Sequence, residues 1–173
     1  MNGESIGHAS RDTVRETLSD SVPAAGAARI AIAATFTADP LQAPLKFWTE
    51  RLDIDAEPVV VPYGQLLPAL LDPGSLLRNP ATCFDLLIVR PEDWIRDRAH
   101  ESCESNARHL QWATDEFLGG VAALRGRTGP VPLAFVCPTS TYAPAVHRQS
   151  LLQIESDLVA RLVERGVHCW GHA

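Results

Sequence analysis

This chain of 173 residues has little of several features that mark particular classes of protein. Lys46 is its only lysine, and the net charge of −6 offers no basic face to the phosphates of nucleic acid. Apolar runs such as residues 30–36 are far too short to span a bilayer. The first residues lack the basic start and the apolar stretch of a signal peptide. We therefore expect a cytoplasmic protein, of a high-GC bacterial type, without nucleic-acid or membrane partners.

Motifs for metals and nucleotides are also missing. The four cysteines, Cys83, Cys103, Cys137 and Cys169, lie at least twenty residues apart and form no Cys-x-x-Cys pair, which argues against zinc. No Gly-x-Gly-x-x-Gly and no phosphate-binding glycine loop with lysine occurs, so we expect no cofactor. Cys83, Cys137 and Cys169 sit in or beside expected strands, where buried structural thiols are the ordinary interpretation.

The residues that are present describe a globular domain. Hydrophobic residues make up 46% of the chain and charged residues 21%. Residues 1–29 differ, because Ser, Gly, Ala, Asp and Arg dominate there, and we expect a flexible tail or linker with at most a short helix over residues 10–18. Residues 30–173 are expected to form one α/β domain, which is either complete or an excised part of a larger protein.

Five strand-like segments alternate with helical segments in this domain. Strands are expected at residues 30–36, 58–62, 84–89, 131–137 and 167–170. Helices are expected at residues 44–52, 65–71 (strained by Pro68) and 104–125, and over a last apolar stripe at residues 151–162. Right-handed crossovers then predict a three-layer, doubly wound domain with a five-stranded parallel sheet in the order 2-1-3-4-5.

Loops rich in polar residues follow four of the expected strands. The carboxyl ends of parallel strands meet at one edge of a sheet, and ligands bind at its switch point, here between the first and third strands. We therefore expect one cleft at that edge, lined by Thr35, Thr37, Tyr63, Gly64, Gln65, Arg90, Glu92, Trp94 and Thr139.

Several segments, in this order, resemble a known family. Ala-Thr-Phe-Thr-Ala-Asp-Pro-Leu at residues 34–41, Pro-Tyr-Gly-Gln at 62–65 and Leu-Asp-Pro-Gly-Ser-Leu-Leu at 71–77 are similar to the amino-terminal, SGNH/GDSL-hydrolase-like region of FkbH-like (HAD-IIIC) proteins. Val-Arg-Pro-Glu-Asp-Trp at 89–94 and Cys-Pro at 137–138 resemble strand ends of similar accessory domains in nonribosomal peptide synthetases and polyketide synthases. The resemblance covers residues 29 to about 170 and implies an SGNH-like, flavodoxin-like fold.

Departures from the family's pattern bear on activity. An SGNH hydrolase needs a Gly-Asp-Ser nucleophile after the first strand, a glycine and an asparagine that donate to the oxyanion, and a late Asp-x-x-His. Here the first strand ends in Thr35-Phe36-Thr37 without serine, Gly64 could take the glycine position, and the asparagine position falls near Arg90. The resemblance therefore implies an accessory domain of secondary-metabolite biosynthesis, without hydrolase activity, that binds an acyl or peptidyl carrier protein or its tethered acyl group.

Four residues remain weak candidates for catalysis: Thr37, Glu92, Asp93 and Cys137. Thr37 or Thr35 could be a nucleophile, but the better prediction is that both hydroxyls cap a helix beginning near Pro40. An active esterase or acyltransferase that uses Thr37 or Cys137 stays an alternative function, and a purely structural subunit-association domain is a second.

The adjacent carboxylates of Glu92 and Asp93 could share acid–base work, because proximity separates their pKa values. The alternative is that Arg90 pairs with one of them while the other caps a helix that starts at Trp94.

The histidines show no motif spacing. His168 and His172 are four residues apart, which on a helix would suit a metal ion, but in a strand this spacing means little and no metal is expected. His147 could face the site, although a solvated position at a helix start is the better prediction.

A partner-binding patch is expected just after the third strand. Arg90, Arg96 and Arg98 could meet an acidic carrier protein there, with Trp94 and Ile95 as apolar contacts. The alternative is that Asp93 and Asp97 neutralise these arginines.

Overall fold

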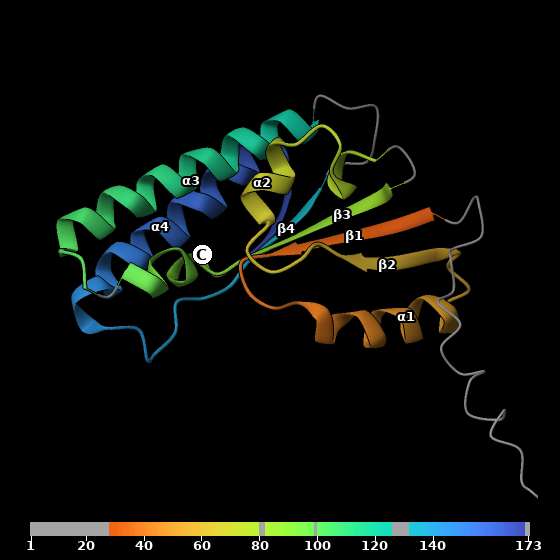
Figure 1. Cartoon of the computed structure of the whole chain (residues 1–173), viewed down its shortest axis with the longest axis horizontal. Coiled ribbons are helices and arrows are strands. Elements are labelled where there is room, and N and C mark those ends of the chain that lie inside the picture. Colours follow the sequence, from red (N-terminus) through yellow and green to blue (C-terminus); the bar gives the residue numbers. More distant parts are fainter. Residues whose placement is uncertain (1–27, 80–81, 99, 126–131, 172–173) are drawn as a thin grey trace, which may run out of the picture.

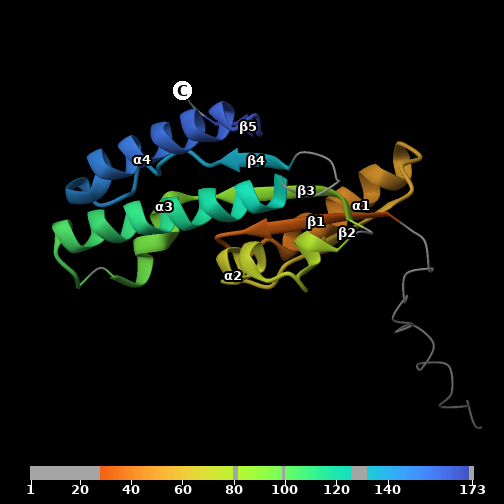
Figure 2. The ribbon, with the colours of Figure 1, turned by 90° about the horizontal axis from the view of Figure 1, so that it is seen from above.

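The computed structural model describes residues 28–79, 82–98, 100–125 and 132–171. Five parallel strands form one sheet in the order β2-β1-β3-β4-β5, with helices on both faces (Figures 1 and 2). The predicted fold class, with its strand order and its three layers, is confirmed. The strands are β1 (Ala28–Ala34), β2 (Ala56–Val60), β3 (Thr82–Val89), β4 (Leu133–Val136) and β5 (His168–Trp170).

The helices lie where the sequence predicts them, with small shifts at their ends. The α-helices are α1 (Gln42–Arg51), α2 (Leu66–Leu71), α3 (Cys103–Arg125) and α4 (Ala145–Glu164), and the 3-10 helices are η2 (Asp39–Leu41), η3 (Leu76–Arg78) and η4 (Pro91–Arg98). The predicted strain at Pro68 is wrong. Pro68 lies in the first turn of α2, where an amide has no acceptor within the helix, so proline removes no hydrogen bond there.

The larger core lies between the sheet and the helices α2, α3 and α4 (Figure 2). Its centre includes Leu87 of β3, Phe117 of α3 and Leu158 of α4, all fully buried. Helices α2 and α3 approach each other closely at Gly120, where an added Cβ would lie 2.7 Å from the Cβ of Leu70. A side chain at position 120 would therefore push the two helices apart.

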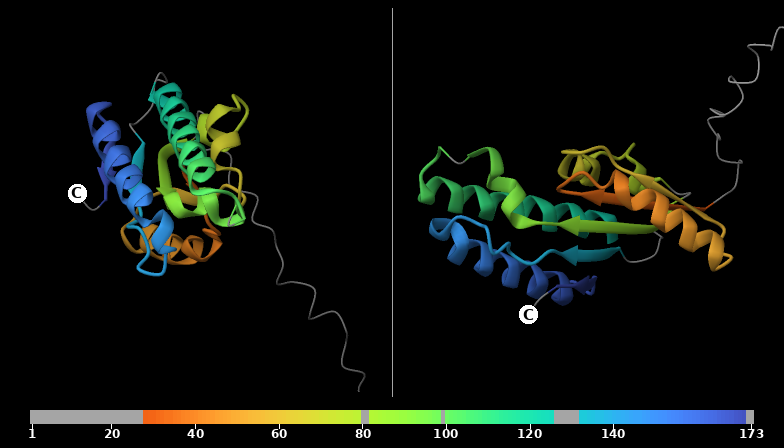
Figure 3. Two further views of the ribbon diagram at one scale, coloured as in Figure 1. Left: turned by 90° about the vertical axis from the view of Figure 1, so that its left-hand side faces the viewer. Right: turned by 90° about the horizontal axis from the view of Figure 1, so that it is seen from below.

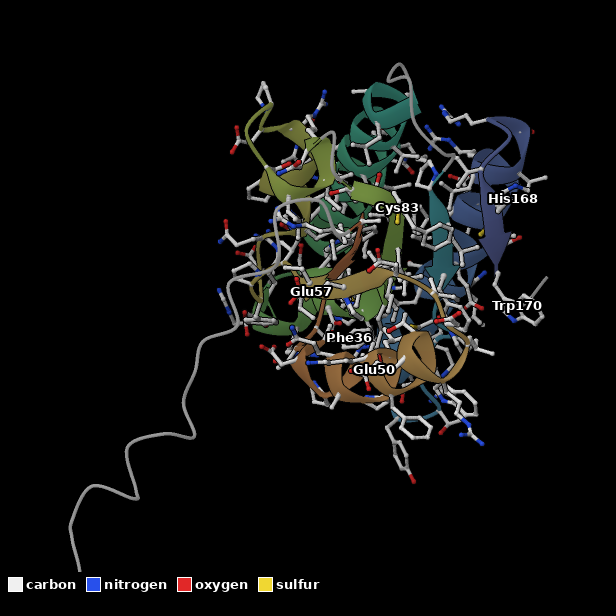
Figure 4. The ribbon with its side chains drawn as sticks, turned by 90° about the vertical axis from the view of Figure 1, so that its right-hand side faces the viewer. Phe36, Glu50, Glu57, Cys83, His168 and Trp170 are labelled. Carbon is white, nitrogen blue, oxygen red and sulfur yellow. The ribbon has the colours of Figure 1, made fainter. Side chains whose placement is uncertain are left out.

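The opposite face of the sheet is covered less completely. Among the described α-helices, only α1 lies on this side (Figure 3), with the short η2 before it. On this face, Ile88 of β3 belongs to the smaller core beside α1. Ile88 pairs in register with Phe135 of β4, and Phe135 pairs with Trp170 of β5, so the three side chains lie on the same face of the sheet. Trp170 is 71% exposed and projects away from the body of the protein (Figure 4). Apolar surface near β4 and β5 thus remains open within the described part of the chain.

Some sequence predictions fall outside the described residues. These are most of the expected tail, including its helix at residues 10–18, the start of the fourth strand at Val131, and His172. Over the described ranges, none of the helices combines the length and the hydropathy that crossing a membrane requires.

The prediction of buried thiols is wrong for Cys83. Cys83 is exposed at the amino-terminal edge of the sheet, where its Sγ donates to the carbonyl oxygen of Arg29 at 3.2 Å (Figure 4). Cys137 and Cys169 are half-buried.

Candidate functional site

The carboxyl ends of β1 and β3 lie side by side and place Thr35 against Arg90. Ala34 pairs with Ile88 in the parallel register, and the amide of Thr35 continues the ladder by donating to the carbonyl oxygen of Ile88 at 3.1 Å. The next residue of β3 is Val89, so both chains leave the sheet at the same level. The loops that follow β1 and β3 therefore begin in contact, as expected at a switch point.

Three residues from these two loops form what we call the strand-end cluster: Thr35, Arg90 and Asp93. The Thr35 hydroxyl accepts a hydrogen bond from the Arg90 amide at 2.9 Å and donates to Oδ2 of Asp93 at 3.0 Å. The Arg90 guanidinium binds the same carboxylate through Nε at 2.9 Å and Nη2 at 2.7 Å. This bidentate pair fixes both the direction and the distance of the two side chains.

The Asp93 carboxylate is almost fully enclosed, with 4% of its side chain exposed. Arg96 also contacts Oδ1 of Asp93. In the 3-10 helix η4, side chains three residues apart lie on the same side, which brings Asp93 and Arg96 together. The hydrogen bonds that Arg90 donates to Asp93, with the charges of Asp93 and Glu92, raise the pKa of Arg90, although the partial burial of Arg90 opposes this shift. The cluster is thus a closed ion-pair network with a fixed charge on Arg90.

Two further carboxylates hold the loop after β4. Glu92 accepts from the amide of Ser140 at 3.4 Å. Glu155, buried on α4, accepts from both the amide and the hydroxyl of Thr139, at 2.8 and 2.9 Å. These bonds satisfy polar groups of a turn that would otherwise lose their water on folding. The loops after β3 and β4 are consequently tied to each other and to α4.

A pocket of about 550 Å³ opens on the α2 side of the cluster, and we call it the switch-point pocket. It is lined by Ala34, Thr35, Tyr63, Gly64, Leu66, Leu67, Pro68, Leu71, Asp93, Trp94, Asp97, Trp112 and Glu116. Gly64 turns the chain here with a φ of 74°, a conformation that side chains disfavour. The amino-terminal part of α3 extends beyond the ends of the strands (Figure 1). Trp112 and Glu116, in the middle of this helix, line the pocket.

A second pocket of about 450 Å³ opens on the other side of Asp93, and we call it the β4-side pocket. It is lined by Arg90, Glu92, Asp93, Ile95, Arg96, Ser140, Tyr142, Ala143, Pro144, Val146, His147 and Leu151. Asp93 lines both pockets, so the strand-end cluster forms the wall between them.

The residues predicted to line one cleft are divided by this wall. Thr35, Tyr63, Gly64 and Trp94 line the switch-point pocket, whereas Arg90 and Glu92 line the β4-side pocket. Thr37, Gln65 and Thr139 line neither: Thr37 and Gln65 are exposed, and the Thr139 hydroxyl is bound to Glu155.

The predicted helix caps are wrong. Ala38, not a threonine, precedes η2, and no side chain caps that helix. The Thr35 hydroxyl is instead bound to Arg90 and Asp93. The Thr35 hydroxyl, which the local sequence assigns to a helix cap, therefore makes tertiary hydrogen bonds instead.

The structural interpretation of Glu92 and Asp93 has two parts, an ion pair of one carboxylate with Arg90 and a helix cap by the other at Trp94. The ion pair is confirmed. Arg90 pairs with Asp93, and at 3.7 Å with Glu92 as well. The other half is wrong, because Glu92 binds the amide of Ser140 rather than capping a helix at Trp94.

Burial raises the pKa of Cys137, although the charge of Arg90 opposes the shift. A higher pKa leaves less thiolate near neutral pH, which counts against Cys137 as a nucleophile.

His147 and Asn106 lie together at the β4-side pocket. The sequence predicts a solvated position for His147 and does not single out Asn106. His147 is buried and lines the β4-side pocket, so its predicted solvated position is wrong. Its Nε2 lies 3.5 Å from Nδ2 of Asn106, which is fully buried on α3 and also donates to the carbonyl oxygen of Arg98 at 3.2 Å. His168 lies exposed in β5, far along the chain from this pair.

The arginines after β3 are largely paired. Arg90 and Arg96 share Asp93, as the neutralising alternative predicts, but Arg98 pairs with Glu101 at 3.8 Å rather than with Asp97. Trp94 is half-buried and packs against Phe117 with ring centroids 6.3 Å apart. Trp94 therefore serves as a pocket wall, and Ile95 is buried, so it offers no exposed contact. Tyr142, 95% exposed in the loop after β4, lines the β4-side pocket with Arg90 and Arg96.

Trp112 and Glu116 of α3 also line the switch-point pocket and escaped sequence reasoning. Their spacing of four residues puts them on one side of the helix, a signal that was available in the sequence. Comparison with known protein families, with curated protein sequences and with solved structures finds no match to this chain.

Proposed function

We propose that this domain is an SGNH-like accessory domain of a nonribosomal peptide or polyketide assembly line. It binds a carrier protein, or the acyl group tethered to it, and does not hydrolyse that group. The observation that carries the proposal is the strand-end cluster, a closed ion-pair network directly after β1, the strand that a serine nucleophile would follow if the family resemblance holds. Beside that cluster a large open pocket is retained.

The cluster supports binding over catalysis because a hydroxyl nucleophile needs a neighbouring base that can take its proton. The Thr35 hydroxyl already donates to Asp93 and accepts from the Arg90 amide, so both of its hydrogen-bonding roles are used. The carboxylate that it meets is itself held by Arg90 and Arg96. Of the two other nucleophiles considered, Cys137 is disfavoured by its raised pKa. Thr37 is exposed and lines neither pocket.

The switch-point pocket supports the binding of a small group. Its volume of about 550 Å³ lies within the range of roughly 300–1,000 Å³ that is usual for ligand sites. Its walls are mainly apolar, and it opens at the edge where doubly wound sheets bind their ligands. An acyl chain of moderate length fits this description.

Carrier-protein docking would use the surface beside the pockets. Arg96 and Arg98 lie there on η4, and Tyr142 and Val146 supply exposed apolar contacts. Because Arg96 and Arg98 have acidic neighbours, an acidic partner must compete with Asp93 and Glu101 for them. The contribution of each arginine to binding is accordingly modest.

The direct test is calorimetric titration with an acyl carrier protein and a peptidyl carrier protein, each in its unloaded and acyl-loaded form. Arg96→Glu with Arg98→Glu should weaken binding about tenfold, or roughly 1.4 kcal/mol. The control is Lys46→Glu with Arg51→Glu on exposed positions of α1, which makes the same change in net charge. Equal affinities for both double variants, with both folded, would contradict the proposed docking surface.

Hydrolysis is tested separately with p-nitrophenyl acetate. We expect turnover near the uncatalysed rate, because only binding and polar stabilisation remain without a nucleophile and its base. Robust turnover that disappears in Thr37→Ala or Cys137→Ser would support the esterase or acyltransferase alternative instead.

A second candidate function, association of subunits, is favoured by the open apolar face near β4 and β5. Phe135 and Trp170 are exposed there on neighbouring strands. If two copies of this chain associate through that face, Trp170→Asp should convert a dimer to a monomer in sedimentation velocity. If the wild-type protein is monomeric at about 100 μM, subunit association is excluded as its function.

A further inference from the structure

We propose that the switch-point pocket selects a ligand in which an ammonium group is attached to an apolar or aromatic body. The preference for a cation follows from the pocket alone. That the ligand arrives as an aminoacyl group on a carrier protein rests on the proposed function.

The apolar part of the ligand is accommodated by α2 and by tryptophan. Helix α2 contributes Leu66, Leu67, Pro68 and Leu71 to one wall. Trp94 forms another wall, and its packing against Phe117 holds the ring in place. Burying apolar surface against walls that already have their final shape requires little reorganisation on binding.

The aromatic side chains also favour a cation. Trp94, Trp112 and Tyr63 all line the same pocket, and the faces of indole and phenol rings attract positive charge. Trp112 and Tyr63 are both more than half exposed, so the two rings stand at the pocket mouth and remain accessible to an entering ligand.

The charges of the pocket are one-sided. Asp93, Asp97 and Glu116 contribute carboxylates, and no basic side chain is among the described residues that line it. Asp93 is neutralised by Arg90 and Arg96, which approach it from the other side. Asp97 and Glu116 make no salt bridge within the described ranges. Two uncompensated negative charges from different elements, η4 and α3, therefore face one ligand.

The β4-side pocket shows the contrast. Arg90 and Arg96 line it together with Glu92 and Asp93, so its fixed charges balance. A cation is therefore preferred only in the switch-point pocket, where the carboxylates of Asp97 and Glu116 lack basic partners among the described residues. This difference separates the two pockets chemically, although they share Asp93.

Three probes of nearly equal shape test the preference by isothermal titration calorimetry at pH 7: 2-phenylethylamine, 2-phenylethanol and 3-phenylpropanoate. The amine should bind at least tenfold more tightly than the alcohol, and the acid more weakly than either. Asp97→Asn with Glu116→Gln should reduce the affinity for the amine to that for the alcohol and leave the alcohol unaffected. Trp112→Ala should weaken the amine and the alcohol.

The matched control is Glu50→Gln with Asp55→Asn, which removes two exposed carboxylates elsewhere on the molecule. It should leave the tenfold preference intact. Any one of four results overturns the inference. The first three are equal binding of the amine and the alcohol, a preference for the acid, and no binding of any probe at millimolar concentration. The fourth is an unchanged preference for the amine in the Asp97→Asn, Glu116→Gln variant.

Carrier proteins loaded with phenylalanyl and with 3-phenylpropanoyl groups separate this inference from the proposed function. Tighter binding of the phenylalanyl form supports both. Equal binding of the two forms overturns the cation preference and leaves the proposed function standing. Binding of 2-phenylethylamine without binding of either carrier protein overturns the proposed function and leaves the cation preference standing.

Discussion

The hydroxyl of Thr35 lies 3.0 Å from the carboxylate of Asp93, a residue 58 positions later in the chain. This contact joins the end of β1 to the first turns of η4 and crosses the switch point of the sheet. It forms the wall between the two pockets. It also occupies one of the two threonine hydroxyls considered as nucleophiles, the other being that of the exposed Thr37.

Replacing Thr35 tests how much this contact stabilises the fold. Thr35→Val keeps the shape of the side chain but leaves the Arg90 amide and the Asp93 carboxylate without their hydroxyl partner. We expect a loss of about 1–3 kcal/mol in the free energy of unfolding, measured by urea denaturation. Thr35→Ser keeps the hydroxyl and should lose less than half as much. A valine variant as stable as the wild type would show that the two hydrogen bonds contribute nothing net.

Asp93 and Asp97 offer a matched pair on η4. Asp93→Asn removes the charge that two arginines share, and a partly buried guanidinium is left without its counterion. Arg90 is 32% exposed, so water compensates for part of this loss; we expect about 2 kcal/mol, below the range for fully buried pairs. Asp97→Asn, at an exposed position, should change stability by no more than about 0.5 kcal/mol. Similar effects of the two substitutions on thermal unfolding would contradict the closed network described above.

Two adjacent glycines of α3 should respond in opposite directions to alanine. Gly120→Ala would place a Cβ 2.7 Å from the Cβ of Leu70, so α2 must move and stability should fall by about 1–3 kcal/mol. Gly119→Ala meets nothing within 4 Å and should stabilise the helix by up to about 1 kcal/mol. Denaturant unfolding of both variants measures the difference, and the prediction fails if Gly120→Ala is the more stable of the two.

Cys137 should react slowly with iodoacetamide because burial raises its pKa. In a variant with serine at positions 83, 103 and 169, alkylation at pH 8 should be at least about threefold slower in the folded protein than in urea. The rate should rise with pH and reach its midpoint above the usual range of a free thiol, since the thiolate is the reactive form. A folded thiol that reacts faster than the unfolded one would revive Cys137 as a candidate nucleophile.

The order of strands and helices could be predicted from sequence because it depends on local patterns. Small and branched apolar residues mark β1 and β3, and a period near 3.6 marks α3 and α4. Once parallel strands alternate with helices, the handedness of the crossovers leaves few arrangements. The edge that carries the loops followed from the same argument, since all parallel strands end on one side.

What lies at that edge was decided by tertiary structure. The hydrogen bonds that Thr35 donates to Asp93, Ser140 to Glu92 and Thr139 to Glu155 join segments between 16 and 58 residues apart. Local rules assigned Thr35 and one of the carboxylates of Glu92 and Asp93 to helix caps, because a capping bond needs only neighbours in sequence. In the folded chain, the hydroxyl and amide groups of these loops bind carboxylates from distant segments, which are stronger acceptors than neutral groups.

The same reason explains the two pockets. The switch-point pocket combines side chains of α2, η4 and α3, and the β4-side pocket combines side chains of η4, the loop after β4 and α4. Local patterns do not indicate which of these separate elements will face one another. The sequence by itself therefore determined the architecture and the edge at which ligands are expected. Packing of distant segments alone decided which hydroxyls, carboxylates and rings face a ligand, because side-chain direction depends on partners that are remote along the chain.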